Sequence, residues 1–410
     1  MVKYGLDLDK YAEIIIRYGL NVQRGQEVVI SSPVNAYEFV RVITKKAYEL
    51  GSGKVTVFYD DDEILRNNFL FDSEDVIRQV PEYVKMQKKY IVDSKSCYLG
   101  IISDDPCVFE GVDAKRIAER QKAIVKACPE YRKALDNNET RWCLVAYPEK
   151  HWAETAFNGE KDAMTRLGSK ISQAMWLDCD DVEQKWKNHV ENLKRRSKIL
   201  NEAQIVKFHY KNSLGTNFEI SMPDKYIFSG ANDVGTLDGV DFIANMPTQE
   251  VFSSPDKNTA QGKLVASLPL VRNGVIIDKF YFVFDKGKVI DFGAEKGEDT
   301  LREILNADEG MKRLGEIALV GYNSPIRQTG TLFYETLFDE NASCHFALGK
   351  SFSSAYQGGT KMSKEELKKV GLNDSVNHVD FMVGTSDLEI IATKKDGSKM
   401  VIFKDGDWAF

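Results

Sequence analysis

The chain has 410 residues, a length typical of two or three domains. Of these residues 43% are hydrophobic and 29% are charged, a balance typical of a globular protein. Its 62 acidic and 55 basic side chains give a formal net charge of −7, which argues against a nucleic-acid-binding protein, because such proteins usually carry clustered basic residues. No stretch approaches the roughly 18 apolar residues of a transmembrane helix and no signal peptide is recognised at the N-terminus, so we expect a cytoplasmic protein without membrane association.

Helical and strand patterns alternate in the first half of the chain. Apolar residues at helical spacing predict a helix that ends near Gly19 and a second helix from about Phe39 to Gly51. Further helices are expected at residues 114–127 and within residues 161–203. Short apolar runs predict strands at residues 28–30, 54–58, 98–102 and 142–147. This alternation indicates an α/β domain with a mostly parallel sheet flanked by helices.

The pattern changes after about residue 203. Short alternating segments separated by Gly, Asn and Asp predict antiparallel strands at residues 205–210, 217–221, 264–267, 274–284 and 289–292. The run Asp285–Lys288 predicts a hairpin turn, and Thr300–Ala307 predicts a helix. We therefore expect an α/β N-terminal domain at residues 1–205 and a β-rich α+β C-terminal domain at residues 206–410.

Three features that resemble ligand sites have simpler explanations. The run Gly51–Lys54 lacks the P-loop spacing and precedes a strand, so it is interpreted as a helix stop. The acidic run Asp60–Glu63 has the residues for Mg²⁺ or Ca²⁺, but a solvated loop that leads into a helix is the better interpretation. The six cysteines contain no C-x-x-C pair, which argues against a zinc ribbon and favours free thiols.

Two clusters of histidine and carboxylate residues lie in the second half of the chain. His378 and Asp380 are two residues apart in a predicted strand, so both side chains project from one face. Such a pair suits Zn²⁺, Co²⁺ or Mn²⁺, although a hydrogen-bonded pair without metal is the simpler interpretation of these two residues alone. Upstream, Glu340 and His345 precede an apolar segment that would carry the histidine into the interior. The other three histidines, His151, His189 and His209, are interpreted as surface or core residues with ordinary partners.

Two further carboxylates interrupt apolar runs. Glu316 lies within Leu314–Val320, and Glu250 lies within Asn245–Phe252. A carboxylate among apolar residues either faces solvent or needs a strong compensating partner. Two of them, together with the two histidine clusters, share one explanation if metal cations neutralise the acids.

Several blocks of this half resemble the M29 family of metallo-aminopeptidases, which includes the thermophilic aminopeptidase T type. The blocks are PTQEVFSSPDK, LGEIALV, SPI, LFYETLFDENASCHFALG and NHVDFMVG, and weaker similarity extends to LDKYAEIIIRYGLNVQRGQEVVISSPV near the start. The resemblance implies a dinuclear metal site in the C-terminal domain. The matching ligand positions are Glu250, Glu316, Glu340, His345, His378 and Asp380.

The same resemblance implies the activity. Two divalent ions, Co²⁺, Zn²⁺ or Mg²⁺, would activate a water molecule that hydrolyses the N-terminal peptide bond of short peptides with a free N-terminus. Glu316 would bridge the ions, and Glu250 and Glu316 are the candidate catalytic acids. Members of the family are commonly homodimers, so a homodimer is expected.

One residue departs from the family pattern. The family usually has a tyrosine seven residues after its first metal-binding histidine, and this chain has Phe352 there, which cannot donate a hydrogen bond. Tyr356 or Tyr334 is a candidate replacement. The departure keeps open an alternative, a peptide-binding protein of the same fold with weakened catalysis. A dinuclear phosphoesterase is a weaker alternative, with Lys257 and Arg327 as its candidate phosphate-binding residues.

Overall fold

The computed structural model describes residues 1–230, 233–272 and 275–410. These residues form two compact units: an N-terminal unit (residues 1–186 and 233–247) and a C-terminal unit (residues 187–230 and the described part of 248–410). The N-terminal unit contains a parallel sheet with helices, and the C-terminal unit is rich in antiparallel strands, so the predicted fold classes are confirmed. The division into domains at residues 1–205 and 206–410 stays a prediction, because compactness alone does not test independent folding.

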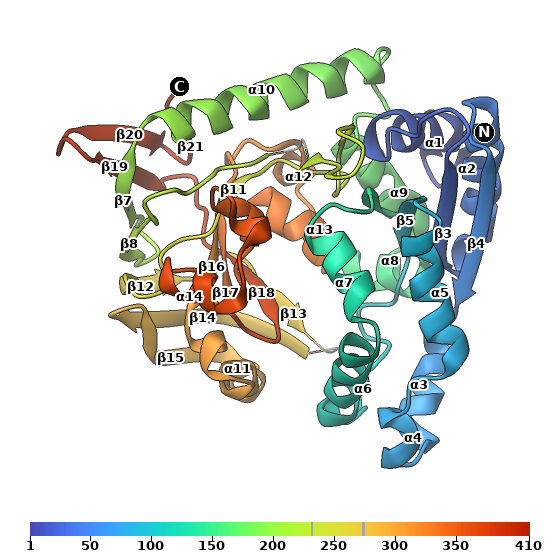
Figure 1. The fold of residues 1–410 in the computed structure, drawn as a ribbon, viewed down its shortest axis with the longest axis horizontal. Helices are drawn as coiled ribbons and strands as arrows, with labels where there is room; N and C mark the ends of the chain where they lie inside the picture. Colours follow the sequence, from blue (N-terminus) through green and yellow to red (C-terminus); the bar gives the residue numbers. More distant parts are fainter. Residues whose placement is uncertain (231–232, 273–274) are drawn as a thin grey trace. The chain divides into compact units, whose positions relative to one another are not determined.

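Four parallel strands form the sheet of the N-terminal unit. In sheet order they are β4 (Lys54–Asp60), β3 (Glu27–Pro33), β5 (Cys97–Ile102) and β6 (Trp142–Ala146) (Figure 1). Each coincides with a strand predicted from a short apolar run. Val28, Val29 and Ile30 are fully buried although successive side chains point to opposite faces, so both faces of the sheet are covered.

A distant segment extends the edge of this sheet at β6. The N–H of Leu144 donates to the carbonyl oxygen of Ala244 at 2.7 Å, and the N–H of Met246 donates to the carbonyl oxygen of Leu144 at 2.9 Å. These bonds assign residues 233–247 to the N-terminal unit. Short two-stranded sheets join β1 (Val2–Lys3) to β2 (Leu6–Asp7) and β9 (Asp233–Val234) to β10 (Asp241–Phe242).

The predicted helices of the first half are present. They are α1 (Leu8–Ile14), which continues as a π-helical turn η1 (Ile15–Gly19), α2 (Tyr37–Glu49), α6 (Ala114–Ala127), α9 (Ala163–Ala174) and α10 (Val182–Glu202). The helix expected after the acidic run Asp60–Glu63 is α3 (Asp62–Phe71). The structure adds η2 (Val34–Ala36), α4 (Glu74–Arg78), α5 (Glu82–Asp93), α7 (Pro129–Asp136) and α8 (Lys150–Ala156), which the patterns did not predict. The acidic run caps a helix as interpreted, because the Asp61 carboxylate accepts the N–H of Ile64 at 3.0 Å.

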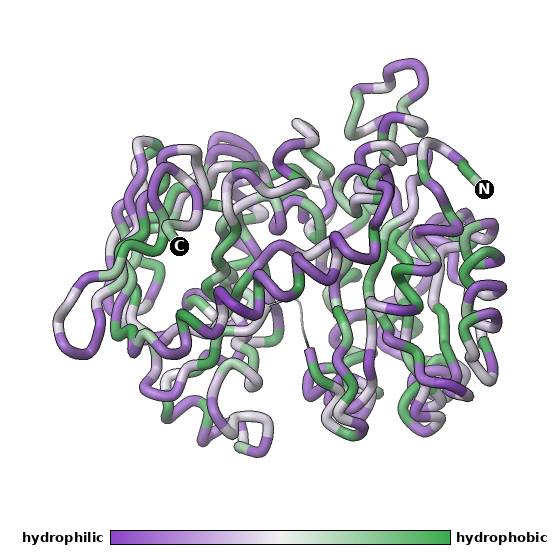
Figure 2. The backbone as a smooth tube through the Cα atoms, turned by 90° about the horizontal axis from the view of Figure 1, so that it is seen from above, coloured by the Kyte–Doolittle hydropathy of each residue, from purple (hydrophilic) through white to green (hydrophobic). Residues whose placement is uncertain are grey.

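Helix α10 illustrates how a mostly hydrophilic segment folds (Figure 2). Leu193 and Leu200 are seven residues apart, lie on one face and are fully buried in the core of the C-terminal unit. The charged residues between them leave the opposite face in solvent.

A nine-stranded antiparallel sheet forms one layer of the C-terminal unit. Its strands are β7 (Ile205–Lys211), β8 (Asn217–Ser221), β12 (Gln261–Val265), β13 (Leu270–Arg272), β14 (Val275–Asp285), β15 (Lys288–Lys296), β19 (Glu389–Lys394), β20 (Lys399–Lys404) and β21 (Asp407–Trp408). The predicted strand at residues 274–284 corresponds to β14, and its first residue, Gly274, lies outside the described residues. The predicted hairpin is confirmed, since Asp285 pairs with Lys288 across β14 and β15.

A second antiparallel sheet packs on the first. Its order is β11 (Val251–Ser253), β16 (Leu314–Leu319), β17 (His345–Gly349) and β18 (His378–Met382). Phe346 lies 5.3 Å from Phe218, and Phe381 lies 5.0 Å from Phe282, measured between ring centroids. Because side chains alternate along a strand, these core contacts leave the opposite face of β16, β17 and β18 for other residues.

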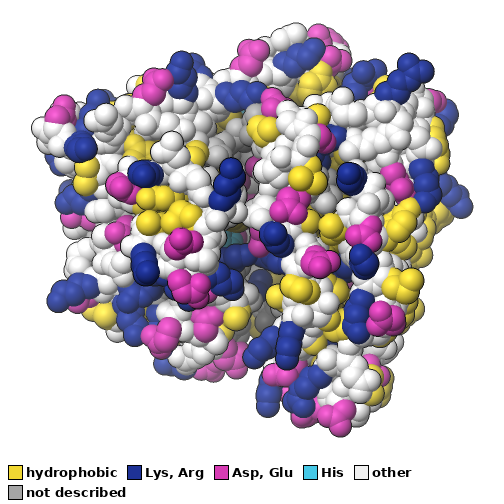
Figure 3. Space-filling model, in the orientation of Figure 1, with side chains coloured by type: hydrophobic (Ala, Val, Ile, Leu, Met, Phe, Trp, Pro, Cys, Tyr) yellow, Lys and Arg dark blue, Asp and Glu magenta, His cyan; other side chains and the backbone are white. Residues whose placement is uncertain are grey.

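Short helices complete the C-terminal unit. They are α11 (Glu298–Asn306), which matches the predicted helix, η3 (Glu309–Lys312), α12 (Pro325–Gln328), α13 (Thr336–Asp339), η4 (Glu340–Ala342), η5 (Ser353–Ala355), η6 (Gly359–Lys361) and α14 (Lys364–Lys369). No helix among the described residues is long and apolar enough to cross a bilayer. None of the six cysteines, all of which lie in the described residues, forms a disulfide. Acidic and basic side chains are interspersed on the face shown in Figure 3.

Candidate metal centre

Three neighbouring strands present four of the six predicted ligands on one face. Glu316 lies on β16, His345 on β17, and His378 and Asp380 on β18. In the antiparallel register, Glu316 lies opposite Ala347, which in turn lies opposite Asp380. The small side chain between the two carboxylates leaves space above the sheet.

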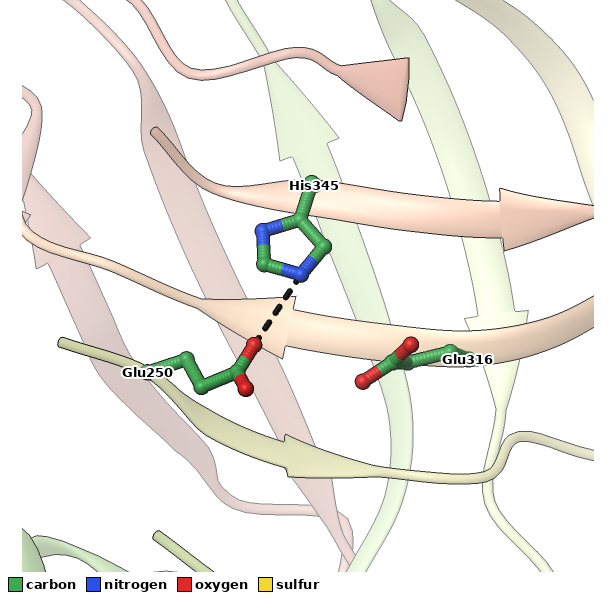
Figure 4. Close-up of side chains that lie close together, drawn as sticks. All are labelled: Glu250, Glu316 and His345. Carbon is green, nitrogen blue, oxygen red and sulfur yellow. Dashed lines mark ion pairs between the residues drawn. The ribbon is translucent and has the colours of Figure 1, made fainter. Parts of the chain in front are cut away.

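The other two predicted ligands come from segments next to the sheet. Glu250 directly precedes β11, and Glu340 is the first residue of η4. The Nε2 atom of His345 lies 3.1 Å from Oε2 of Glu250. Figure 4 shows the carboxylate of Glu316 turned toward this pair.

A hydrogen bond joins the segments that carry these two acids. The side-chain Oδ1 of Asn341 accepts the main-chain N–H of Gln249 at 2.7 Å. Because Gln249 precedes Glu250 and Asn341 follows Glu340, this bond fixes the two carboxylates with respect to each other.

All six predicted residues therefore meet in one place. Three overlapping groups offer ligand atoms that lie within 4.8 Å of one another. The groups are Glu250 with Glu316 and His345, Glu316 with His378 and Asp380, and Glu340 with His345 and Asp380.

Main-chain carbonyl groups orient both histidines. Nδ1 of His345 lies 3.0 Å from the carbonyl oxygen of Ser343, and Nδ1 of His378 lies 2.7 Å from that of Lys350. A ring whose Nδ1–H donates to a carbonyl presents Nε2 to the site, as metal-binding histidines usually do. Nε2 of His378 accordingly faces Glu316, at 2.8 Å from Oε2.

The buried groups shift one another's pKa values. Burial, opposed by the hydrogen bond and charge of His378, raises the pKa of Glu316 to about 7. Burial also raises the pKa of Glu340 well above its ordinary value. Burial would lower the pKa of His345, but the hydrogen bond and charge of Glu250 outweigh it and raise that pKa to about 10. Without a cation, the centre therefore retains protons that isolated side chains would have released.

The donor set fits divalent cations. Carboxylate oxygens and imidazole nitrogens together suit zinc-like transition metals, and carboxylates also suit Mg²⁺. Buried carboxylates that raise one another's pKa values are stabilised when cations replace the retained protons. The oriented Nε2 atoms and the clustered acids thus have the chemistry of a metal centre.

This arrangement predicts how pH affects the stability of the metal-free protein. The pKa of Glu316 rises from 4.5 to about 7 on folding, so its ionisation destabilises the fold as the pH increases between these values. The pKa of His345 rises from 6.5 to about 10, so its stabilising contribution is complete below pH 6.5 and is lost as the pH rises through about 10. Both effects have the same sign. From pH 5 through pH 7 to pH 9, the Tm of the chelator-treated wild type should fall more than the Tm of the chelator-treated Glu316→Gln variant. Parallel pH profiles of Tm in the two proteins would contradict the assignment.

The other three histidines lie outside the centre, as interpreted from the sequence. Their ring nitrogens face oxygen atoms of nearby residues at 2.8 to 3.2 Å, and these residues are Glu149, Thr248 and Asn217. Sequence patterns missed Arg272, which ends β13 close enough to the centre for the charge of Asp380 to act on it. The only signal was a basic residue directly after the apolar run Leu268–Val271.

Phe352 lies beside the centre. Its ring centroid is 4.9 Å from that of His378 and 5.4 Å from that of Phe252. Tyr356, one candidate for the missing hydroxyl donor, donates instead to Oδ1 of Asp224 at 2.9 Å. The aromatic ring expected at this position is therefore present without its hydroxyl group.

Comparisons with known proteins agree with this geometry. Residues 6–408 match the sequence profile of family M29, described as thermophilic metalloprotease. Aminopeptidase AmpS from Bacillus subtilis (strain 168) is 39% identical over 412 residues, which cover 100% of both chains. Aminopeptidase PepS from Streptococcus thermophilus is 36% identical over 98% of each chain. The solved structure of wild-type AmpT from Thermus thermophilus matches with a TM-score of 0.91 at 31% identity, covering 98% of this chain and 99% of that one.

Proposed function

Because the chain belongs to the M29 family of thermophilic metalloproteases, we propose that it is a metal-dependent aminopeptidase that removes the N-terminal residue from short peptides. The observation that carries the proposal is the convergence of four carboxylates and two oriented histidines on one sheet face. The aminopeptidase names of the relatives AmpS and PepS support it.

The six side chains are proposed to hold two divalent ions. Glu316, His345 and Asp380 each belong to two of the three ligand groups, and the carboxylate of Glu316 is the one that would be shared between the ions. Co²⁺, Zn²⁺ and Mg²⁺ are the proposed ions. When bound, such ions lower the pKa of water and polarise the scissile carbonyl group.

Glu250 and Glu316 are the proposed catalytic carboxylates. Glu250 lies within hydrogen-bond distance of His345, and Glu316 lies opposite Ala347, whose small side chain leaves space above the sheet. A carboxylate in this position accepts the proton of the attacking water and returns it to the leaving amine. A carboxylate side chain of the centre would recognise the free α-amino group, which an N-acetylated peptide lacks.

A chelation experiment tests the proposal. Removal of metal is expected to lower the release of free amino acids from short peptides by at least about 100-fold, because the water nucleophile loses its activation. Reconstitution with Co²⁺, Zn²⁺, Mn²⁺ or Mg²⁺ should restore cleavage with at least one ion, and N-acetylated peptides should stay intact. Cleavage of the acetylated controls, or full activity in chelator, would contradict the proposal.

Phe352 supports a second candidate, a peptide-binding protein of this fold with weakened catalysis. Its ring contacts His378 but carries no hydroxyl group to donate. Tight peptide binding by the metal-loaded protein without release of amino acids would favour this candidate.

The remaining proposals concern the setting of the enzyme. The family resemblance supports a homodimer, and the composition supports a cytoplasmic location. The elution volume in size-exclusion chromatography with light scattering tests the first of these.

A further inference from the structure

Arg272 has a half-buried guanidinium group for which the described part of the chain supplies no hydrogen-bond or ion-pair partner. Arg141 shows the partners that a buried arginine can have in this protein. Its side chain is buried, pairs with Asp238 at 3.0 Å and donates to the carbonyl oxygen of Asn21 at 2.5 Å. A partly desolvated guanidinium group without such partners is available to bind an anion.

Arg272 ends β13, a strand whose preceding residues lie beside the ligand face of the sheet. The segment before β13 is bonded to the end of β18, because the N–H of Ser267 donates to the carbonyl oxygen of Met382 at 2.8 Å. Met382 lies opposite His345 in the sheet register and lines a cavity together with Leu270 and Val271 of β13. This cavity therefore adjoins the ligand face of the sheet.

Among the described residues, neither Asp380 nor the acids that line this cavity pair with Arg272. Burial lowers the pKa of Arg272, and the charge of Asp380 opposes this shift without a hydrogen bond between the two. Glu335 and Asp339 also line the cavity, but they accept main-chain N–H groups, from Leu337 at 3.3 Å and from Phe333 at 2.9 Å.

Bound cations would leave Arg272 without a compensating charge. The proposed ligands include four carboxylates, with a charge of −4, and two divalent ions would contribute +4. The guanidinium group would then face a neutral centre and attract an anion. Its planar fork matches the two oxygens of a carboxylate better than a lysine ammonium does.

We propose that Arg272 is a specificity-determining residue that binds a carboxylate of the peptide substrate, on the part of the peptide that leaves after cleavage. This inference rests on the proposed aminopeptidase activity. The carboxylate comes either from the C-terminus of a very short peptide or from an acidic side chain after the scissile bond, and the test below distinguishes the two.

Four peptides and three variants test the role of Arg272. Leu-Leu is compared with Leu-Leu-amide, and Leu-Glu-amide with Leu-Gln-amide. In Arg272→Gln, KM for the matching carboxylate substrate is expected to rise about 10- to 100-fold, since a charge-assisted hydrogen-bonded pair is worth about that factor. KM for the amide partner should change less than about twofold. The KM of Arg272→Lys for the carboxylate substrate should lie between the values of the wild type and of Arg272→Gln. Arg302→Gln, which removes an exposed arginine paired with Glu298, should have the KM of the wild type.

The pattern identifies the source of the carboxylate. A selective loss with Leu-Leu assigns the C-terminal carboxylate, and a selective loss with Leu-Glu-amide assigns the side chain. An equal change for acid and amide substrates, or no change in Arg272→Gln, overturns the proposal.

A binding measurement separates this inference from the proposed activity. Calorimetry with the metal-loaded protein uses the uncleavable Leu-Leu analogue with a methyleneamine in place of the peptide bond, as the free acid and as the amide. Arg272→Gln should weaken binding of the acid about 10- to 100-fold and leave the amide unchanged. This pattern without any cleavage would retain the role of Arg272 and refute the aminopeptidase. Cleavage of peptides by a protein that binds the acid and the amide analogue equally would retain the aminopeptidase and refute the role of Arg272.

Discussion

Glu316→Gln is expected to lower kcat/KM for peptide hydrolysis by more than about 100-fold. Loss of even an outer hydrogen-bond partner of a metal ligand lowers metal affinity or activity by about 10- to 100-fold. Glu316 is buried at the centre of β16 and belongs to two ligand groups. The amide keeps the shape of the side chain but removes its negative charge. Metal content measured by mass spectrometry should fall together with activity.

The same variant separates a functional loss from misfolding. Ionised Glu316 is unfavourable in the metal-free protein, since burial raises its pKa to about 7. Metal-free Glu316→Gln should therefore melt at or above the wild type at pH 8. Glu309→Gln is the matched control, because Glu309 is exposed and pairs only with Lys288 and Lys312 among the described residues. Full turnover in Glu316→Gln would exclude Glu316 as a metal ligand.

Phe352→Tyr is expected to raise kcat at least about 10-fold, because one well-placed donor to an oxyanion is worth about 10²–10³ in rate. The ring already lies 4.9 Å from that of His378, between centroids, so the substitution adds a hydroxyl group beside the centre and keeps the packing. The side chain is 38% exposed, which leaves room for the added oxygen. Steady-state kinetics with a good dipeptide substrate measures the change.

Phe352→Leu is the control for ring packing. It removes the aromatic contacts with Phe252 and His378 and adds no donor, so it should not raise kcat. An unchanged rate in Phe352→Tyr would show that this protein does not need the hydroxyl group. Restored turnover from a nearly inactive wild type would instead support the peptide-binding candidate.

Local sequence patterns predicted the parallel sheet well. Its strands are short apolar runs such as Val28–Ile30, bounded by Gly, Ser and Pro, and burial on both faces requires such runs. The same method missed β19 and β20. Their alternating residues mix Glu, Lys and Thr with apolar residues, a pattern that half-buried strands share with exposed loops.

The sequence patterns did not show which part of the chain residues 233–247 would bond to. Residues 233–247 follow the first strands of the β-rich half in sequence, yet they bond to β6 through Leu144. Nothing in a short segment rich in Gly, Asp and Asn indicates which distant edge will accept its hydrogen bonds.

The sequence by itself determined the chemical identity of the candidate centre. The apolar runs around Glu250 and Glu316, the pair His378 and Asp380, and the cluster before His345 were visible without coordinates. A carboxylate in an apolar run needs compensation wherever the chain places it, so this information is local.

Only the tertiary structure decided how these groups meet. The register that aligns Glu316 with Asp380 across Ala347 depends on three strands far apart in the chain. The Lys350 carbonyl group that orients His378, and the position of Arg272, follow from the same packing, whereas the carbonyl group that orients His345 comes from Ser343, two residues away. A shift of one residue in any of these strands would turn its side chains to the other face, and no periodicity within a single strand specifies that register.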